Sequence, residues 1–378
     1  MREMGARALK LGIPLSVQLD LTYRCNERCV HCYLDHDDHG EMTTAEIKDL
    51  LDQLAAAGVF FLILSGGEIF LRKDLFDIVE YARKLMFSVK LKTNAVMIRN
   101  AKAKRIAALG VASVQISVYS HRAEVHDAIT KLPGSFRRTI EGARLLKSNG
   151  VKVSFANVLM KHNAGDYPEV QALAAELGVG YGVDATITPM MDGDRSILDL
   201  NVAPAALEQV FHNSTLVGNA EEFCAPPSGP LAESDALDTL PCSAGHTACY
   251  VSPYGDVFPC VQFPLPSGNV RKTRFLDIWQ HSPQLKEVRA ITAADLQGCS
   301  TCVHGGSCSR CPGLAYLEGN MRGPSTQDCE KSLARTGVPS MNLLRKRSAA
   351  TLAEPATGGA SPRPLSGNHP VVWMVAQS

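Results

Sequence analysis

An alternation of short apolar runs with helix-like segments is the feature that most restricts the fold of this chain. From residue 15 to about residue 216, β-branched and apolar runs of strand length alternate with segments whose apolar residues recur at helical spacing. This alternation is typical of a parallel sheet built from βα units. Six strands are expected, at residues 15–21, 59–64, 89–93, 113–118, 151–159 and 181–188.

The segments between these strands carry helix start and stop signals. The first helix is expected to begin at a capping box formed by Thr43 and Glu46. Further helices are expected at 74–85, 101–109, 135–149, 166–177 and 204–211, and Gly58, Gly110, Gly150 and Gly178 stand where helices should end. Six βα units predict an α/β fold, a partial (β/α)6 TIM-like barrel, whose functional groups lie at the C-terminal ends of the strands.

Composition divides the rest of the chain. The expected barrel domain spans 1–216, and a segment rich in Pro, Ala and acidic residues at 217–241 is interpreted as a linker. A small Cys-rich extension at 242–338 follows it. The remaining residues, 339–378, are rich in Ala, Pro, Gly and Ser and are expected to be disordered.

The charge balance excludes some classes of partner. The chain carries 38 Lys and Arg and 38 Asp and Glu, which gives no basic surplus for nucleic acid or for an anionic membrane surface. No signal peptide and no apolar run of membrane-spanning length is recognisable. A cytoplasmic protein is expected.

Twelve cysteines are many for a cytoplasmic protein, where thiols stay reduced. Disulfides would need a secreted context, so metal or cluster ligation is the favoured interpretation. Cys25, Cys29 and Cys32 form a C-x3-C-x2-C loop directly after the first expected strand. Three thiolates leave one iron of a 4Fe-4S cluster open. A zinc site completed by His31 or His36 remains an alternative.

At this point the sequence resembles a known family. LTYRCNERCVHCY is similar to the signature loop of the radical S-adenosylmethionine (SAM) superfamily, and the resemblance extends over about residues 15–216. It implies a 4Fe-4S cluster whose open iron binds SAM, and one-electron cleavage of SAM to a 5'-deoxyadenosyl radical. That radical would abstract a hydrogen atom from the substrate.

The resemblance also implies residues that bind SAM. Gly66, Gly67 and Glu68, after the second strand, resemble the family motif whose backbone and carboxylate hold the SAM amino group. Taken alone, the two glycines fit an ordinary tight turn between strand and helix equally well.

Four further residues are SAM-binding candidates. Thr93, Asn94 and Ser117, near the ends of strands three and four, resemble positions that face the SAM ribose and carboxylate. Arg138 is a candidate partner for the SAM carboxylate, because Arg binds carboxylates through a bidentate fork. A solvated helix charge is the alternative interpretation of Arg138.

Seven of the eight cysteines in the extension follow a recognisable order of spacings. C-x-x-C pairs in this order predict two four-ligand sites, which suit zinc or iron-sulfur clusters equally. The order resembles the SPASM extension of radical SAM enzymes that modify peptides, which carries two auxiliary 4Fe-4S clusters and brings the total to three. The resemblance assigns Cys242, Cys260 and Cys311 to the nearer cluster, and Cys299, Cys302, Cys308 and Cys329 to the farther one.

Two departures from the SPASM pattern leave questions open. The gap before Cys311 is two residues where three are usual, and the nearer cluster lacks an obvious fourth ligand. Cys249 and Cys224 are the candidates, and an open iron is the alternative. A buried structural thiol is a further role for either cysteine.

The expected function is modification of a ribosomally made peptide or protein by hydrogen abstraction, giving a crosslink, a thioether or an oxidation. The expected partners are the precursor peptide, a flavodoxin- or ferredoxin-type electron donor and, because only 24 residues precede Cys25, a separate leader-peptide-binding protein. A SPASM-type enzyme acting on a small molecule is one alternative. An iron-sulfur electron-transfer protein is the other.

Overall fold

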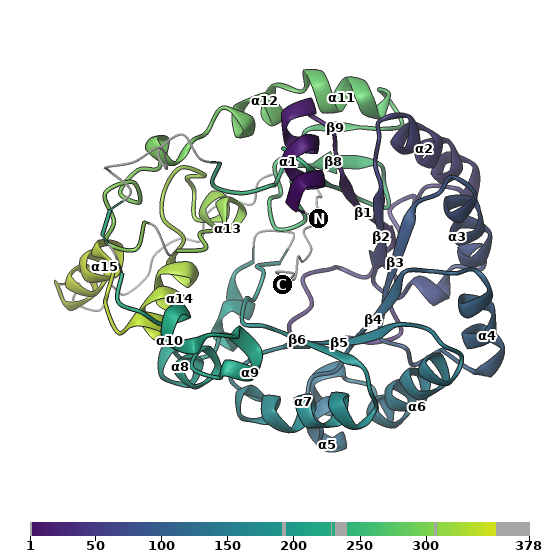
Figure 1. The fold of residues 1–378 in the computed structure, drawn as a ribbon, viewed down its shortest axis with the longest axis horizontal. Coiled ribbons are helices and arrows are strands. Elements are labelled where there is room, and N and C mark those ends of the chain that lie inside the picture. The colour runs from purple at the N-terminus through teal and green to yellow at the C-terminus, as the bar shows by residue number, and fades with distance from the viewer. Residues whose placement is uncertain (1, 191–193, 228, 231–239, 306–307, 353–378) are drawn as a thin grey trace.

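A curved parallel sheet with helices on its outer side forms the first part of the molecule (Figure 1). The computed structural model of the chain describes residues 2–190, 194–227, 229–230, 240–305 and 308–352. All six expected strands are present and pair in parallel with their chain neighbours, which confirms the partial barrel. They are β1 (Ser16–Thr22), β2 (Phe61–Gly66), β3 (Ser88–Thr93), β4 (Ser113–Ser117), β5 (Val153–Val158) and β6 (Gly180–Asp184).

The expected helices are also present. The capping box is confirmed, because the Thr43 side chain accepts from the Glu46 N–H and the Glu46 carboxylate accepts from the Thr43 N–H. The predicted helices are α2 (Thr44–Ala56), α3 (Leu75–Lys84), α4 (Asn100–Ala108), α6 (Ser135–Ser148), α7 (Tyr167–Glu176) and α8 (Pro204–Phe211). Among the described residues up to β6, two α-helices were not predicted, α1 (Arg2–Leu11) and α5 (Ala123–Thr130).

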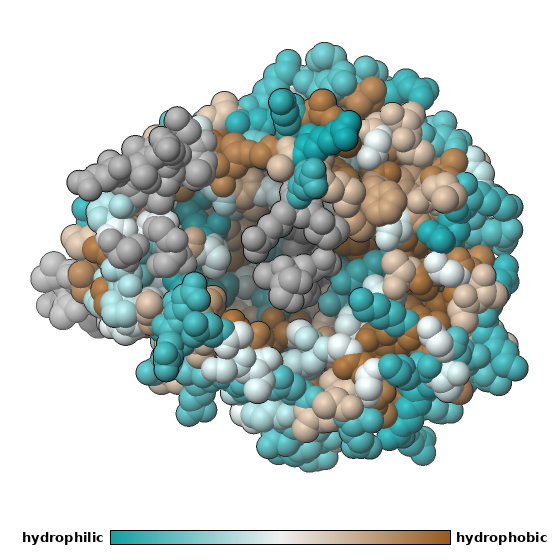
Figure 2. All heavy atoms as spheres, in the orientation of Figure 1, coloured by the Kyte–Doolittle hydropathy of each residue, from teal (hydrophilic) through white to brown (hydrophobic). Residues whose placement is uncertain are grey.

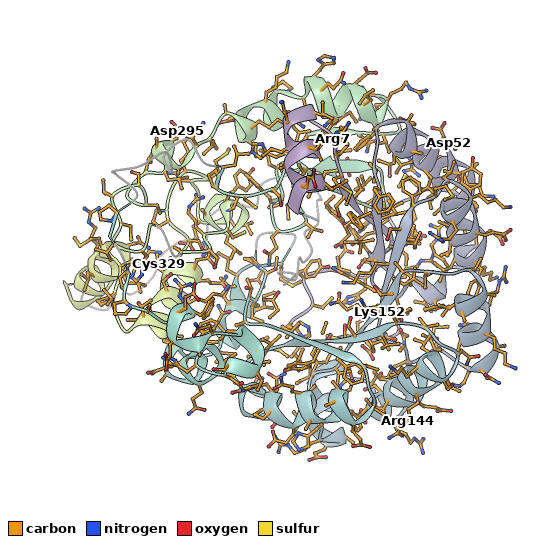
Figure 3. All side chains as sticks on the ribbon, viewed as in Figure 1. Arg7, Asp52, Arg144, Lys152, Asp295 and Cys329 are labelled. Carbon is orange, nitrogen blue, oxygen red and sulfur yellow. The ribbon has the colours of Figure 1, made fainter. Side chains whose placement is uncertain are left out.

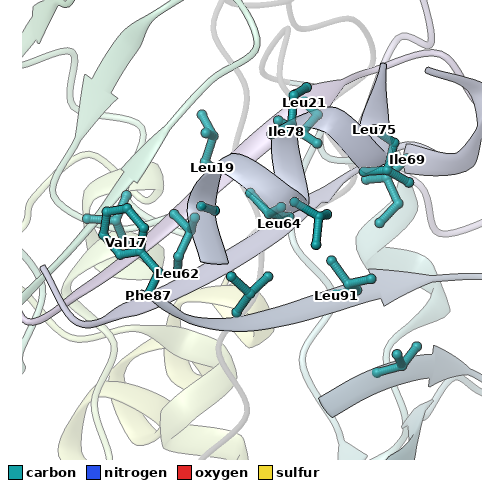
Figure 4. Packing of buried hydrophobic residues seen from close by; sticks show 14 of the residues in the cluster. Val17, Leu19, Leu21, Leu62, Leu64, Ile69, Leu75, Ile78, Phe87 and Leu91 are labelled. Atoms are coloured by element: carbon teal, nitrogen blue, oxygen red, sulfur yellow. The ribbon is translucent and has the colours of Figure 1, made fainter. Parts of the chain in front are cut away.

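Side chains alternate across the strands and build two different faces. On β3, Val89 and Leu91 are buried in the main core between sheet and helices, whereas Lys90 and Lys92 occupy the alternate positions, toward the barrel interior. Figure 4 shows part of this outer core, including Val17 of β1. A complete barrel of this type fills its interior with branched apolar residues. A polar inner face leaves room for a ligand instead.

The Cys-rich extension adds strands to the same sheet. β7 (Ala248–Val251) pairs in parallel with β1, and β8 (Asp256–Phe258) and β9 (Gly268–Asn269) continue the sheet in antiparallel fashion. Two helices, α11 (Phe275–His281) and α12 (Pro283–Arg289), follow them. The extension is therefore part of the barrel sheet, which the sequence pattern did not predict.

The last described elements are α13 (Pro312–Leu317), α14 (Thr326–Thr336) and α15 (Met341–Leu352). The expectation of disorder from residue 339 is wrong for α15. The Ser340 side chain caps this helix by accepting from the Leu343 N–H at 3.3 Å, and Leu343 is buried. Lys346 pairs with Glu318 at 3.1 Å. The rest of the expected tail, 353–378, lies outside the described residues.

The expected linker at 217–241 is only partly described. Its first residues contain α10 (Ala220–Phe223), which follows α9 (Ser214–Val217), while 228 and 231–239 lie outside the described residues. Figure 2 shows mainly hydrophilic residues along the rim of the molecule, over the outer helices. Among the described helices, none has the length and apolar character needed to cross a membrane.

Candidate functional site

The loop after β1 brings its three cysteines to one cavity. Cys25, Cys29 and Cys32 all line a cavity of about 160 Å³ at the C-terminal ends of the strands. The backbone N–H groups of Arg28 and Val30 anchor the loop by donating to carbonyl oxygens at the end of α5, at 3.0 and 2.9 Å. Burial raises the pKa of Cys25 to about 12 and that of Cys32 to about 11. Because metals bind the thiolate, these thiols need a metal or cluster to ionise at neutral pH.

The two glycines after β2 allow the backbone to pass close to this loop. Gly66 has φ +137°, and a Cβ at this position would overlap the Thr22 carbonyl oxygen. A Cβ at Gly67 would lie 2.5 Å from the Tyr23 carbonyl oxygen. The Gly67 N–H donates to the Thr22 carbonyl oxygen at 2.8 Å. Both glycines line the cavity and also position the cysteine loop.

Glu68 follows β2 and is fully buried next to the end of β3. Its carboxylate accepts from the Thr93 hydroxyl at 2.8 Å, the Asn94 N–H at 2.9 Å and the Phe70 N–H at 3.0 Å. Burial raises its pKa despite these bonds. Thr93 and Asn94 line the cavity, whereas Glu68 is absent from the described residues that line it. The carboxylate therefore holds the ends of β2 and β3 together from behind the cavity wall.

Ser117 and Arg138 differ in their positions. Ser117 lines the cavity at the end of β4. Arg138, on α6, is absent from the described lining residues, and its guanidinium donates to the carbonyl oxygens of Pro133 at 2.8 Å and Gly134 at 3.0 Å. The structure brings Ser117 to the cysteine loop but directs the Arg138 hydrogen bonds back to its own helix start.

The cavity has a polar wall that the sequence analysis missed. Its charged and amide side chains come from β3, β4, β5 and β6: Lys92, Gln115, Asn157 and Asp184. Lys92 Nζ donates to Gln18 Oε1 at 3.1 Å, and Gln18 Nε2 donates to Asp20 Oδ1 at 3.0 Å. Burial lowers the pKa of Lys92 to about 8 and raises that of Asp184 to about 6. The signal was available on β3 and β4, where polar residues recur at every second position.

Two buried polar atoms at the cavity have no partner among the described residues. They are Glu27 Oε1 and His31 Nδ1, and both residues line the cavity. Burial, followed by the charge of Glu68, raises the pKa of Glu27 to about 8. Burial also lowers the pKa of His31 to about 4. Three thiols that line one cavity, a glycine cradle and unsatisfied polar atoms fit a cluster with a polar ligand on its open iron.

A second cavity lies in the extension. The four cysteines assigned to the farther cluster, Cys299, Cys302, Cys308 and Cys329, all line a cavity of about 370 Å³. Figure 3 shows Cys329 in this part of the molecule. In the described part of the chain, no three His, Cys, Asp or Glu side chains converge on a point that suits one metal ion. Four thiols that line one cavity fit a site with four thiolate ligands, as a 4Fe-4S cluster requires.

The third cysteine group is absent from the described lining of both cavities. Cys242 and Cys260 pack against one small cluster around Phe263. Burial, then the charge of Cys242 and that of Cys311, raise the pKa of Cys260 to about 12. Cys311 Sγ lies 3.7 Å from Gln262 Oε1. The charges of Cys242 and Cys311 thus act on Cys260, and their common ligation of the nearer cluster stays a prediction.

The two remaining cysteines lie elsewhere. Cys249 on β7 is in the outer core with Val251, on the sheet face opposite to Tyr250, which packs in the cluster that Cys260 contacts. The Cys224 thiol donates to the Phe211 carbonyl oxygen at 3.2 Å. Neither arrangement supplies a fourth thiolate to the nearer group.

Family models match both parts of the chain. The model described as "Radical SAM superfamily" matches residues 19–174, and the model described as "Iron-sulfur cluster-binding domain", SPASM, matches residues 242–312. The fold is similar to that of Streptococcus suis SuiB bound to precursor peptide SuiA, with a TM-score of 0.68 and 18% identity over 86% of this chain and 79% of that chain.

Two kinds of curated relative are similar at about the same level. The mycofactocin maturase MftC of Mycobacterium tuberculosis is 33% identical over 79% of this chain and 78% of its own length. The AdoMet-dependent heme synthase of Methanosarcina barkeri is 30% identical over 80% of this chain and 92% of its own length. Each of these matches covers about four fifths of this chain.

Proposed function

Because the chain belongs to the radical SAM superfamily and is an enzyme of its SPASM-containing branch, we propose that it modifies a ribosomally made peptide or protein by hydrogen abstraction. The observation that carries this proposal is the 33% identity to a mycofactocin maturase, which spans both the barrel and the extension. The relatives are enzymes, which argues against the alternative of an iron-sulfur electron-transfer protein.

Each group of residues has a role in this proposal. Cys25, Cys29 and Cys32 hold the first cluster and leave one iron for SAM. When bound, cluster and SAM together supply a one-electron cleavage that yields a 5'-deoxyadenosyl radical. Gly66 and Gly67 position the loop. Thr93, Asn94 and Ser117 line the cavity that the ligand occupies. The proposed role of Arg138 at the SAM carboxylate requires its side chain to leave the Pro133 and Gly134 carbonyls.

The extension holds two auxiliary clusters in the same proposal. Cys242, Cys260 and Cys311 ligate the nearer one, and the four cysteines around the 370 Å³ cavity ligate the farther one. Protein purified without oxygen is then expected to carry about twelve irons per chain. A flavodoxin- or ferredoxin-type protein in the cytoplasm supplies electrons, and a separate protein presents the leader of the precursor peptide.

A small-molecule substrate is the second candidate function. The 30% identity to an AdoMet-dependent heme synthase supports it as directly as the maturase identity supports a peptide. The polar wall with Lys92 and Asp184 suits a charged small molecule as well as a peptide side chain.

Isotope transfer separates the two functions. Reconstituted enzyme, SAM and a strong reductant are incubated with a deuterated candidate precursor peptide or with a deuterated tetrapyrrole. The proposal expects deuterium in 5'-deoxyadenosine from the peptide. Transfer from the tetrapyrrole with none from the peptide would contradict it. Iron content measured beforehand on the same samples shows that the enzyme was loaded.

A further inference from the structure

Arg310 is a buried cation in the wall of the second cavity. It is 9% exposed and lines this cavity together with the four cysteines assigned to the farther cluster. Its Nε donates to the Gly323 carbonyl oxygen at 2.7 Å, and its Nη2 donates to the Met321 carbonyl oxygen. The third nitrogen, Nη1, is buried and has no hydrogen-bond partner among the described residues. Two backbone carbonyls therefore fix the guanidinium and leave one donor nitrogen without an acceptor.

The surroundings of this nitrogen indicate which acceptor it meets. The guanidinium lies near enough to Cys299 for its positive charge to act on that thiol. An arginine side chain stays protonated in proteins, and a buried cationic N–H group without an acceptor is costly. A 4Fe-4S cluster with four thiolate ligands is an anion whose sulfur atoms accept hydrogen bonds. A cluster in the second cavity would therefore supply the acceptor that Nη1 lacks.

Asp328 is the one carboxylate among the described residues that line this cavity. Its Oδ2 accepts from the Cys311 N–H at 2.8 Å, and its Oδ1 accepts from Lys331 Nζ at 3.4 Å. This carboxylate is thus bonded to the start of α13 and to its own helix, α14, and it leaves Nη1 of Arg310 unsatisfied.

Two neutral donors reach sulfur atoms of the same cysteine group. Ser332 on α14 donates its hydroxyl to Cys308 Sγ at 3.5 Å, and Asn342 on α15 donates from Nδ2 to Cys329 Sγ at 3.7 Å. The sulfur is the acceptor in both contacts, so both can persist when the thiols lose their protons to bind iron. Charged and neutral donors from separate segments of the chain therefore surround the farther cluster site.

We propose that Arg310, Ser332 and Asn342 raise the reduction potential of the farther auxiliary cluster, with the largest contribution from Arg310. Hydrogen bonds to the sulfurs and a nearby positive charge favour the reduced cluster, because it carries one more negative charge than the oxidised cluster. These side chains ligate no iron, so they set how easily the cluster is reduced without changing which atoms hold it. The inference rests on the proposed function only in that a 4Fe-4S cluster occupies the second cavity.

Redox titration of the reconstituted full chain, followed by electron paramagnetic resonance, tests the inference. The signal of the farther cluster is identified by its loss when Cys299 and Cys302 are replaced by Ala. Arg310→Gln is expected to disfavour one-electron reduction at least about tenfold, which corresponds to about 59 mV, because it removes the buried charge. Ser332→Ala and Asn342→Leu each remove a neutral donor and are expected to lower the potential by less.

Two further variants separate charge from packing. Arg310→Lys keeps a cation in the cavity wall and is expected to recover part of the potential that Arg310→Gln loses. Arg322→Gln is the matched control with unchanged potential, because Arg322 pairs with Glu287 at 3.0 Å and is absent from the described lining of the cavity. Iron content is measured on every sample, so that potentials are compared between proteins with equal cluster loading.

The outcomes separate this inference from the proposed function. An unchanged potential in Arg310→Gln at full iron content overturns the inference and leaves the cluster assignment intact, and so do equal potentials in Arg310→Lys and Arg310→Gln. If the Arg310 variants hold no farther cluster, Asn342→Leu decides, and a wild-type potential there overturns the inference. If replacing Cys299 and Cys302 changes neither iron content nor spectrum, the proposed cluster site is wrong and the inference fails with it.

Discussion

Single backbone positions decide whether the cysteine loop can form. Gly67 sits where the chain turns from β2 against the end of β1, and any side chain there meets the carbonyl oxygens of Tyr23 and Arg24. Backbone atoms cannot move aside as a flexible side chain can. The loop that holds Cys25 must then shift, so the requirement for glycine is tied to the metal site itself.

Gly67→Ala is therefore expected to lower iron content by about a third, the share of one cluster in three, and to reduce stability. Iron analysis and denaturant unfolding measure the two effects. Gly5→Ala is the control, because a Cβ at Gly5, within α1, meets nothing within 4 Å. Full iron content in the Gly67 variant would show that the loop tolerates the shift.

The face of the sheet on which a thiol lies separates structural from ligating cysteines. Cys249→Ala is expected to keep all iron and to lose about 1 kcal/mol or more of stability, because it removes a buried apolar group. Cys260→Ala is expected to lose the iron of the nearer cluster. Iron and spectroscopic cluster counts on both variants check this. Iron loss in the Cys249 variant would make Cys249 the fourth ligand.

At the scale of elements, α11 attaches the extension to the barrel. Trp279 is 1% exposed, its indole N–H donates to the Gly12 carbonyl oxygen at 2.6 Å, and the Arg289 guanidinium lies 4.3 Å from its ring centre. Its ring stacks near that of Phe275, in the same core as β1. This helix therefore seals one end of the barrel core.

Trp279→Ala is expected to cost about 3–5 kcal/mol, since it opens a cavity in this core. Leu276→Ala on the same helix is the control, because Leu276 is 39% exposed and such surface changes stay within about 0.5 kcal/mol. Urea unfolding followed by circular dichroism measures both. A Trp279 variant as stable as the Leu276 variant would show that α11 does not contribute to the barrel core.

Element periodicity explains how much of the fold was predictable. The strands β1 to β6 follow apolar runs and alternate with helices long enough to show a helical period, so the sequence indicates them. The strands β7 to β9 are four, three and two residues long, and strands this short carry no readable alternation. The place of β7 beside β1 depends on contacts between residues more than 200 positions apart, which local patterns do not encode.

The candidate site was predictable to a similar degree. Cys25, Cys29 and Cys32 share one loop, so their spacing alone predicts a common site. The hydrogen bonds of Glu68 to Thr93 and Asn94, and the position of Glu27 in the cavity lining, result from how three strand ends meet. Residue type and spacing cannot show which of two nearby carboxylates faces a cavity.

At the scale of the whole molecule, barrel and extension form one sheet. Truncation after residue 241 would remove β7 and expose Val17 and Leu19 of β1 along an unpaired edge. We expect such a fragment to aggregate or to remain unfolded, because an exposed apolar edge strand is a template for association. Size-exclusion chromatography against the full chain checks this. A monomeric, folded fragment would show that the barrel is independent.

The two ends of the molecule are nevertheless expected to have separate roles in the reaction. Replacing Cys299 and Cys302 by Ala removes a ligand pair from the farther site. SAM cleavage under strong reductant should persist, while modification of the true substrate is lost. Replacing Cys25, Cys29 and Cys32 should abolish cleavage itself. Both variants are compared only after circular dichroism shows that their secondary structure is intact. Full product from the Cys299 and Cys302 variant would make the farther cluster dispensable.

The pairing of β7 with β1 also fixes a spacing. Cys25 follows the end of β1, and Cys260 follows β8, which is paired to β7, so a continuous ladder of backbone hydrogen bonds runs between the first and the nearer auxiliary site. A slip of one residue in that ladder would displace one site by about 3.3 Å and turn Cys249 toward the barrel interior. Electron tunnelling slows steeply with distance. If the proposed clusters occupy both sites, we expect the sheet to hold them at a fixed distance, and with it the rate of any electron transfer between them.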